Sequence, residues 1–310
     1  MTGHHALLNY GGHQEVAPEA WLQALSALLA EGRPVAVLID DWESADADSR
    51  AFVGVDVGGT HTDVQVVFGA REARGKALTT YDDFSRGVLE SIGVAAESLG
   101  VPLQRLLSDT QLLCNATTVV TNVIAQSRGS KVGVLVTAGF RDEFRFAGGP
   151  RLRLLDDHLQ TNVRQLVDRR DIFEVDGRID ATGTELVAVD EGQIEAAARR
   201  LVEERGVRAI AICFLSSYAN PAHEDAAAAI VRRLYPDLFV TASHAVSSTR
   251  GEYPRWMTAV LNCFVYEDAK IFLDTVSTKL KAAGLGGHAV FFQGLGGGIS
   301  KARAEQFPLA

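Results

Sequence analysis

One stretch decides the fold of this chain: Val53-Gly54-Val55-Asp56-Val57-Gly58-Gly59-Thr60-His61-Thr62-Asp63-Val64-Gln65-Val66-Val67. Two apolar, β-branched runs flank its glycine pair, and this pattern predicts a β-hairpin with a tight turn. Because Gly58 and Gly59 have no Cβ, they can adopt positive φ and let backbone N–H groups converge on one point. Such a concavity suits an anion, so the sequence predicts a hairpin that grips phosphate.

The polar residues around the turn have the chemistry that a phosphate site needs. Thr60 and Thr62 carry hydroxyl donors, while Asp56 and Asp63 carry carboxylates that can hold a hydrated Mg²⁺ against the phosphates. The turn is not a P-loop, because no Gly-Lys-Ser/Thr follows it, and a dinucleotide fingerprint needs a helix where a strand follows here. A plain hairpin with capping Asp and Thr residues is the alternative. The length of the Asp-x-Gly-Gly-Thr-x-Thr-Asp string favours the phosphate site.

A second group of hydroxyls lies at the start of a predicted helix. Residues 117–124 read Thr-Thr-Val-Val-Thr-Asn-Val-Ile, and Thr117 and Thr118 come at the N-terminal end. Free N–H groups and the helix dipole at that end can add to an anion site. Thr117 can equally well serve only as the helix cap, and the pattern does not decide between the two interpretations.

Composition limits the class of protein. The 310 residues are 47% hydrophobic, enough for a packed core, and the net charge of −9 argues against a nucleic-acid or anionic-membrane partner. No apolar run approaches the roughly 20 residues that span a bilayer, and Met1–His5 lack the features of a secretory signal, so we expect a cytoplasmic protein. Three dispersed cysteines indicate small core residues rather than disulfides or a metal site. Three histidines lie near the N-terminus: His4, His5 and His13. Histidines at a chain end are more typical of solvated chain than of a metal site.

The remaining pattern predicts an α/β protein in three parts. Residues 1–50 read as a helix (18–31), a strand (35–40) and a linker, an appendage without an assigned chemistry. Residues 51–250 contain the hairpin and then a helix, strand, helix, strand alternation over 190–243, which predicts parallel crossovers. A long apolar helix over 257–283 then begins a last part, 251–310. The apolar face of this helix is expected to lack an intramolecular cover and to associate with other chains.

The motifs resemble the A-type subunit of the hydantoinase/oxoprolinase family, whose relatives include acetone and acetophenone carboxylases. The resemblance covers residues 52 to about 300, and four segments carry most of it: 55–63, 115–122, 137–142 and 216–224. It implies a ribonuclease-H-like fold of the actin/hexokinase/Hsp70 type, with two domains that close over ATP. It also implies that Asp56 holds hydrated Mg²⁺ and that Gly58, Gly59 and Thr60 hold phosphate.

Family members use ATP to activate a carbonyl oxygen as a phosphate ester, a reaction that depends on placement, Mg²⁺ and charge neutralisation. The chain departs from the family at Asn115-Ala116, where His-Gly is usual, and it contains only the first of the family's two phosphate hairpins. We therefore expect one jaw of a nucleotide clamp, with a second domain that is incomplete and no activity of the chain alone.

Three functions follow from this resemblance. The first is a subunit of an ATP-dependent ketone carboxylase, a ligase that works with other subunits on a small-molecule substrate. The second is a subunit of a hydantoinase or oxoprolinase type lactam hydrolase. The third is a non-catalytic scaffold that keeps the hairpin but no longer binds nucleotide. An autonomous small-molecule kinase fits least well, because the second half of the clamp is missing.

Overall fold

A computed structural model describes residues 7–9, 36–38, 50–146, 166–294 and 296–309. The expected helix over 18–31, the linker before Arg50 and the three terminal histidines lie outside the described residues. The strand expected over 35–40 is present as β2, Ala36–Leu38, which pairs in parallel with β1, Leu7–Asn9.

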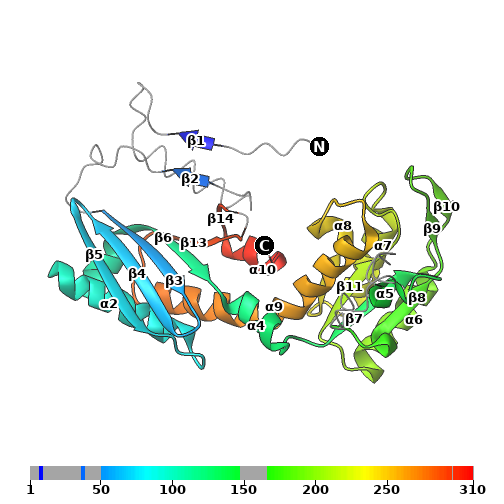
Figure 1. Ribbon diagram of the computed structural model, residues 1–310, viewed down its shortest axis with the longest axis horizontal. Helices are drawn as coiled ribbons and strands as arrows, with labels where there is room; N and C mark the ends of the chain where they lie inside the picture. Colours follow the sequence, from blue (N-terminus) through cyan, green and yellow to red (C-terminus); the bar gives the residue numbers. More distant parts are fainter. Residues whose placement is uncertain (1–6, 10–35, 39–49, 147–165, 295, 310) are drawn as a thin grey trace, which may run out of the picture. The chain divides into compact units, whose positions relative to one another are not determined.

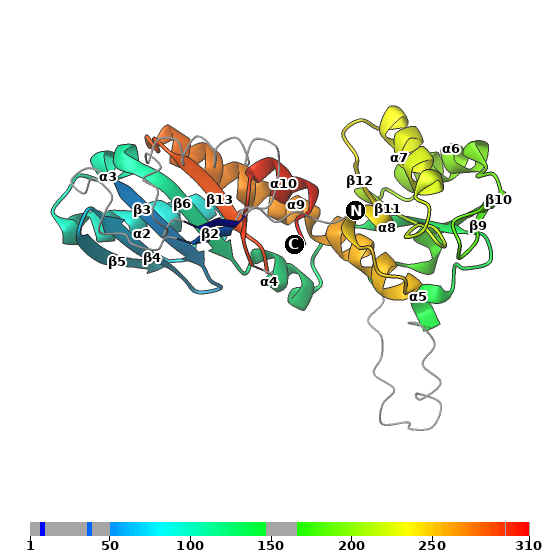
Figure 2. The same cartoon turned by 90° about the horizontal axis from the view of Figure 1, so that it is seen from above.

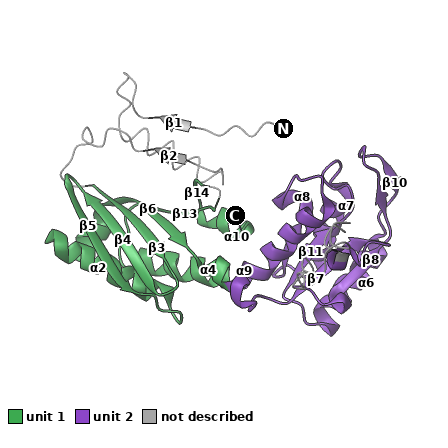
Figure 3. Ribbon diagram, in the orientation of Figure 1, with its two compact units in different colours: residues 1–122, 268–308, 310 green, residues 123–267, 309 purple. Residues whose placement is uncertain are grey.

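The chain divides into two compact units (Figure 3). Unit 1 holds residues 1–122, 268–308 and 310, and unit 2 holds residues 123–267 and 309. The observed division therefore does not follow the expected boundaries at 50 and 250, because unit 2 is inserted within unit 1. Residues 268–308 return to unit 1, where β13 pairs with β6. Turn-forming residues cannot mark such a discontinuous unit, since they show only where an element ends.

Unit 1 is built on a mixed six-stranded sheet with the order β14-β13-β6-β3-β4-β5 (Figure 1). The predicted hairpin is present, and β3, β4 and β5 form an antiparallel meander, while β6 and β13 extend the sheet in parallel to β3. The bounds of its strands are β3 Ala51–Val57, β4 His61–Phe68, β5 Arg71–Leu78, β6 Thr110–Thr117, β13 His288–Phe292 and β14 Gly298–Ile299.

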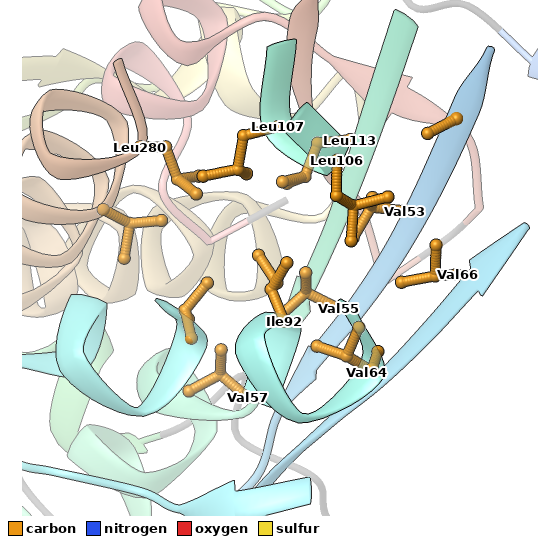
Figure 4. Close-up of a cluster of buried hydrophobic side chains, with 14 of the residues drawn as sticks. Val53, Val55, Val57, Val64, Val66, Ile92, Leu106, Leu107, Leu113 and Leu280 are labelled. Carbon is orange, nitrogen blue, oxygen red and sulfur yellow. The ribbon is translucent and has the colours of Figure 1, made fainter. Parts of the chain in front are cut away.

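One face of this sheet forms the core of unit 1. Alternate residues of β3 are buried, as period-2 hydrophobicity requires, and they pack with apolar side chains of α2 (Phe84–Leu99), α3 (Leu103–Asp109) and the end of α9 (Glu252–Ala282). Figure 4 shows Val55 next to Ile92, and Leu280 next to Leu107, in this core. Helix α2 begins at Asp83, whose side chain caps it, and ends at Gly100 in the left-handed conformation. The short α10 (Lys301–Gln306) follows β14.

Unit 2 is a four-stranded, all-parallel sheet with the order β12-β11-β7-β8. The alternation predicted over 190–243 is confirmed, because α6 and α7 connect parallel strands and pack on each other. Its main elements are β7 Val132–Thr137, β8 Ile172–Val175, α6 Glu191–Arg199 with a π-helical turn Arg200–Glu204, β11 Ala209–Cys213, α7 Ala222–Leu234 and β12 Phe239–Ala242. Smaller elements of unit 2 are α5 Glu143–Phe146, a 3₁₀ turn Arg169–Asp171, β9 Arg178–Ile179, β10 Glu185–Val187 and α8 Ser243–Val246. Helix α4, Val119–Gln126, begins in unit 1 and ends in unit 2.

Helix α9 contributes to both units and is well covered. Trp256 and Val260 are fully buried in the first half, and Val276 and Leu280 are buried in the second (Figure 2 shows α9 along the strands of unit 1). The expectation that its apolar face lacks an intramolecular cover is therefore wrong. The second half of the helix is part of the core of unit 1, and in the first half the Trp256 ring packs on Phe144, with 5.7 Å between ring centroids.

Two expectations from composition are tested in the described part of the chain. None of its helices is long and apolar enough to cross a membrane. All three cysteines are free, and Cys213 and Cys263 are core residues as expected. Cys114 differs, since it is only partly buried and lies on the face of the sheet opposite the core. Burial still raises its pKa to about 11.

Candidate functional site

The turn between β3 and β4 consists of Gly58, Gly59 and Thr60, and it closes with a hydrogen bond from the Gly58 N–H to the His61 carbonyl oxygen at 3.0 Å. Both glycines are described, and neither has a positive φ, so the expectation that they supply left-handed backbone is wrong. Gly58 is instead needed because the turn leaves little room for a side chain at this position. A Cβ there would lie 3.0 Å from the His61 carbonyl oxygen, tighter than nearly all real Cβ contacts.

The carbonyl oxygens of the turn are all held from one side. The Thr79 hydroxyl donates to the Gly58 oxygen at 2.8 Å, and the Tyr81 hydroxyl donates to the Gly59 oxygen at 2.5 Å. The Thr79 N–H donates to the Thr60 oxygen at 2.9 Å. We call the segment Thr79–Tyr81 the 79–81 strap. Its role was not predicted from the sequence, although hydroxyl residues directly after a strand were a visible signal.

The N–H groups of Gly59 and Thr60 differ from the carbonyl oxygens of the turn. Within the described ranges, no acceptor bonds the amide N–H of Gly59 or Thr60, and the Thr60 hydroxyl has no partner there either. Both residues are exposed. The turn therefore presents hydrogen-bond donors to solvent while its acceptors are occupied, which is the arrangement that an oxyanion needs.

The two aspartates differ in their surroundings. Asp56 on β3 and Asp63 on β4 are direct cross-strand neighbours, and both are exposed. The Lys76 ammonium on β5 lies 2.7 Å and 3.0 Å from the two oxygens of Asp63. The side-chain carboxylate of Asp56 has no ion pair or hydrogen bond within the described residues. Asp56 is thus the carboxylate available to a cation, whereas Asp63 already has a counter-charge.

The threonines expected to bind phosphate also differ in their accessibility. Thr62 is fully buried, and its hydroxyl lies 3.1 Å from the Thr79 hydroxyl, so it braces the strap and is not accessible to phosphate. Thr117 accepts from the Val119 N–H at 3.2 Å and therefore caps α4. Thr118 is exposed, and its N–H donates to the Val57 carbonyl oxygen at 3.1 Å, which places the start of α4 beside the turn.

The site has a groove next to it on the outer face of the unit 1 sheet. Gly54, Cys114 and Ala116 form a floor of small side chains, and the groove extends along Asp56 with a volume of 730 Å³. Phe292, half exposed, is another lining residue. Small floor residues leave room for a ligand or another segment beside the exposed carboxylate.

Asn115 is the residue where the chain departs from its resemblance. Its side chain is buried, and neither of its amide atoms has a hydrogen-bond partner in the described part of the chain. It pairs in register with Val55, a core residue of β3. Asn115 therefore faces the core rather than the exposed donors of the turn.

The other motif segments meet in unit 2 and form a buried polar network. Glu224 accepts from the Phe214 N–H at 2.8 Å and from the Ser243 hydroxyl at 2.6 Å. The buried Arg255 donates to the same Ser243 oxygen and to Glu252. These bonds join the ends of β11 and β12 to the start of α9. Burial raises the pKa of Glu252 despite its bonds to Ser216 and Arg255.

Two histidines belong to this region. His223 is buried, and its Nε2 lies 2.6 Å from a Glu185 oxygen. The hydrogen bond from His244 to Glu224, at 2.7 Å, raises the pKa of His244 above its ordinary value. Within the described residues, no group of three or more His, Cys, Asp or Glu side chains is arranged to hold a metal ion.

Comparison with known proteins agrees with this geometry. The model of the hydantoinase/oxoprolinase N-terminal region matches residues 52–235, and the chain belongs to this family. It is 31% identical over 262 residues to the acetophenone carboxylase gamma subunit of Aromatoleum aromaticum, which covers 81% of this chain and 36% of that protein. It is also 31% identical over 254 residues to the caprolactamase subunit alpha of Pseudomonas jessenii, covering 79% of this chain and 35% of that one.

Solved structures show the same fold. The nucleotide-free structure of acetone carboxylase matches with a TM-score of 0.74 and 25% identity over 85% of this chain and 39% of that chain. The ATP-dependent caprolactamase of Pseudomonas jessenii matches with a TM-score of 0.70 and 30% identity over 78% and 35%. The fold is thus α/β of the actin/hexokinase type. The chain spans just over a third of the length of these relatives.

Proposed function

We propose that this chain is the phosphate-binding part of a subunit of a cytoplasmic, ATP-dependent enzyme complex that activates a carbonyl oxygen by phosphorylation. The observation that carries the proposal is the hairpin turn, whose Gly59 and Thr60 N–H groups have no acceptor among the described residues while its carbonyl oxygens are occupied. The Asp56 carboxylate, also without a partner among those residues, lies at the end of the preceding strand. Donors and a carboxylate side by side fit a phosphate with its magnesium ion.

The residues present define the roles. The N–H groups of Gly59 and Thr60 and the exposed hydroxyl of Thr60 would bind and orient phosphate oxygens, and the start of α4 at Thr118 would add its positive dipole end. Asp56 would hold Mg²⁺ through water. Bound ATP would supply the phosphoryl group that activates a carbonyl oxygen as a phosphate ester. Exclusion of water would need cover from another domain or subunit, since Gly59, Thr60 and Asp56 are exposed.

The substrate is proposed to be a ketone, as for the acetophenone and acetone carboxylases among the relatives. A lactam is the second candidate, because the caprolactamase subunit is equally similar in sequence. Partner subunits purified with the chain would separate the two. ADP release that depends on acetophenone and bicarbonate supports the carboxylase, and release that depends on caprolactam supports the hydrolase.

Calorimetric titration of the full chain with Mg·ATP tests the phosphate site. We expect Asp56→Ala to weaken binding about tenfold or more, since it removes the one unpaired carboxylate of the hairpin. Asp237→Ala is the matched control, because Asp237 is also exposed and lies far from the hairpin in sequence, in unit 2. No heat with millimolar Mg·ATP, together with full activity of a complex carrying Asp56→Ala, would leave only the scaffold function.

A further inference from the structure

We propose that the 79–81 strap sets the direction of the two amide N–H groups that receive phosphate, and so is a positioning element of the site. The inference rests on the proposed function. Thr79 and Tyr81 act through the turn, since their hydroxyls bond its carbonyl oxygens.

The argument starts from the geometry of the peptide bond. In a planar trans peptide the C=O and the following N–H point in opposite directions. No cis peptide occurs in the described chain. The Thr79 hydroxyl holds the Gly58 oxygen, so it also directs the N–H of Gly59 away from the strap. The Tyr81 hydroxyl holds the Gly59 oxygen and directs the N–H of Thr60 in the same manner.

Neither of these two N–H groups has an acceptor among the described residues. A diglycine turn has unusual backbone freedom, so without restraint its peptides can rotate and present a carbonyl oxygen instead of an N–H. A carbonyl oxygen would repel phosphate where an N–H attracts it. The strap therefore selects the donor-outward form before any ligand arrives, which lowers the ordering cost of binding.

The strap is itself anchored. The Thr79 hydroxyl lies 3.1 Å from the buried Thr62 hydroxyl, and the Thr79 N–H bonds the Thr60 oxygen. The Tyr81 ring makes an edge contact with Phe84, at 5.8 Å between ring centroids, and Phe84 in turn contacts the core residue Phe272. Tyr81 is nevertheless 50% exposed, so its hydroxyl can be removed with little loss of burial.

Three variants isolate the strap. Tyr81→Phe removes one donor and keeps the ring, and Thr79→Val removes the other donor with nearly constant volume. Thr79→Ser keeps the hydroxyl and is the rescue. Two controls lose a hydroxyl hydrogen bond in unit 2: Tyr235→Phe, where the hydroxyl bonds Glu203, and Thr258→Val, where it bonds the Pro254 oxygen.

The full chain and each variant are titrated with Mg·ATP and with magnesium pyrophosphate, and the backbone amide signals of Gly59 and Thr60 are followed by NMR. We expect each of Tyr81→Phe and Thr79→Val to weaken binding about three- to tenfold, the effect of one hydrogen bond. The amide that each hydroxyl directs should lose most of its ligand-induced shift, Thr60 in Tyr81→Phe and Gly59 in Thr79→Val. Thr79→Ser and both controls should stay within about twofold of the unmodified chain.

The outcomes separate this inference from the function on which it rests. If the unmodified chain binds and both strap variants bind equally well, the inference is overturned and the phosphate site stands. If the strap variants lower thermal stability as the controls do but leave affinity and amide shifts unchanged, the strap is only structural. If the unmodified chain binds neither probe and Asp56→Ala is without effect in the complex, the proposed function fails and the strap's role with it.

Discussion

Asp63 and Lys76 show how a single ion pair shapes the site at the scale of the residue. Asp63 is the direct cross-strand neighbour of Asp56, and two adjacent carboxylates repel each other. Lys76, on the next strand, supplies the counter-charge to Asp63. Both partners are more than half exposed, so the pair adds about 1 kcal/mol or less to stability, and its larger effect is on the charge beside Asp56.

Lys76→Ala leaves the two carboxylates without this counter-charge. We therefore expect Mg²⁺ alone to bind about three- to tenfold more tightly, since roughly 1 kcal/mol of repulsion between cation and ammonium is removed. Calorimetry at low ionic strength measures the change, because salt screens it. Arg86→Ala, which breaks a comparably exposed ion pair with Asp82, is the control. Weaker Mg²⁺ binding in Lys76→Ala would contradict this account, because it would show that Lys76 favours Mg²⁺ binding rather than opposing it by charge repulsion.

At the scale of the element, the contact between α2 and β5 depends on glycine. A Cβ on Gly75 would lie 1.8 Å from the Ser91 carbonyl oxygen, a backbone atom that cannot move without the helix. Gly87 on α2 similarly approaches the Leu78 carbonyl oxygen, with 2.6 Å to an added Cβ. These glycines let the helix lie close to the strand that leads into the strap.

Gly75→Ala is expected to destabilise the protein by about 3 kcal/mol, because the helix must move away from the strand. Gly93→Ala on the same helix is the matched control, since an added Cβ there meets nothing within 4 Å. Alanine loses less backbone entropy than glycine on folding, so the Gly93→Ala variant should be more stable than the unmodified chain by about 0.5 to 1 kcal/mol. Urea unfolding followed by circular dichroism measures both, and equal losses in the two variants would contradict this account of the contact.

At the scale of the whole molecule, two separate cores support the chain. The core of unit 1 lies on one face of its mixed sheet, and the core of unit 2 lies between its parallel sheet, α6 and α7. Multi-unit chains often open one unit at a time. A substitution in one core is therefore expected to act mainly on its own unit.

Ile212→Ala, a fully buried position of β11, should cost about 2 to 5 kcal/mol in unit 2. Amide hydrogen exchange should become faster in β7, β11 and β12, while β3 and β4 keep their protection. Val66→Ala in β4 is the reciprocal variant, with the opposite distribution expected. Equal acceleration in both units from either variant would show a single cooperative unit instead.

The sequence by itself determined the elements and the central hairpin. Strand alternation places Val53, Val55 and Val57 on one face, and the caps Asp83 and Gly100 define α2, because these signals are local and need no distant partner. The family and the residues at the turn were predictable for the same reason, since Asp56 to Asp63 form one continuous string.

Only the tertiary structure decided which of those residues are available. Thr62 shares the buried face of its strand with Val64 and Val66, as alternation already indicates, but its contact with the Thr79 hydroxyl depends on the pairing of strands. The ion pair of Asp63 with Lys76 likewise depends on cross-strand register, which no local pattern shows. The insertion of unit 2 and the bonds of the 79–81 strap were likewise not predicted, because both depend on contacts between residues that are far apart in the sequence. The sequence pattern thus predicted which chemical groups lie at the turn, and pairing across the sheet determined which of these groups are accessible to a ligand.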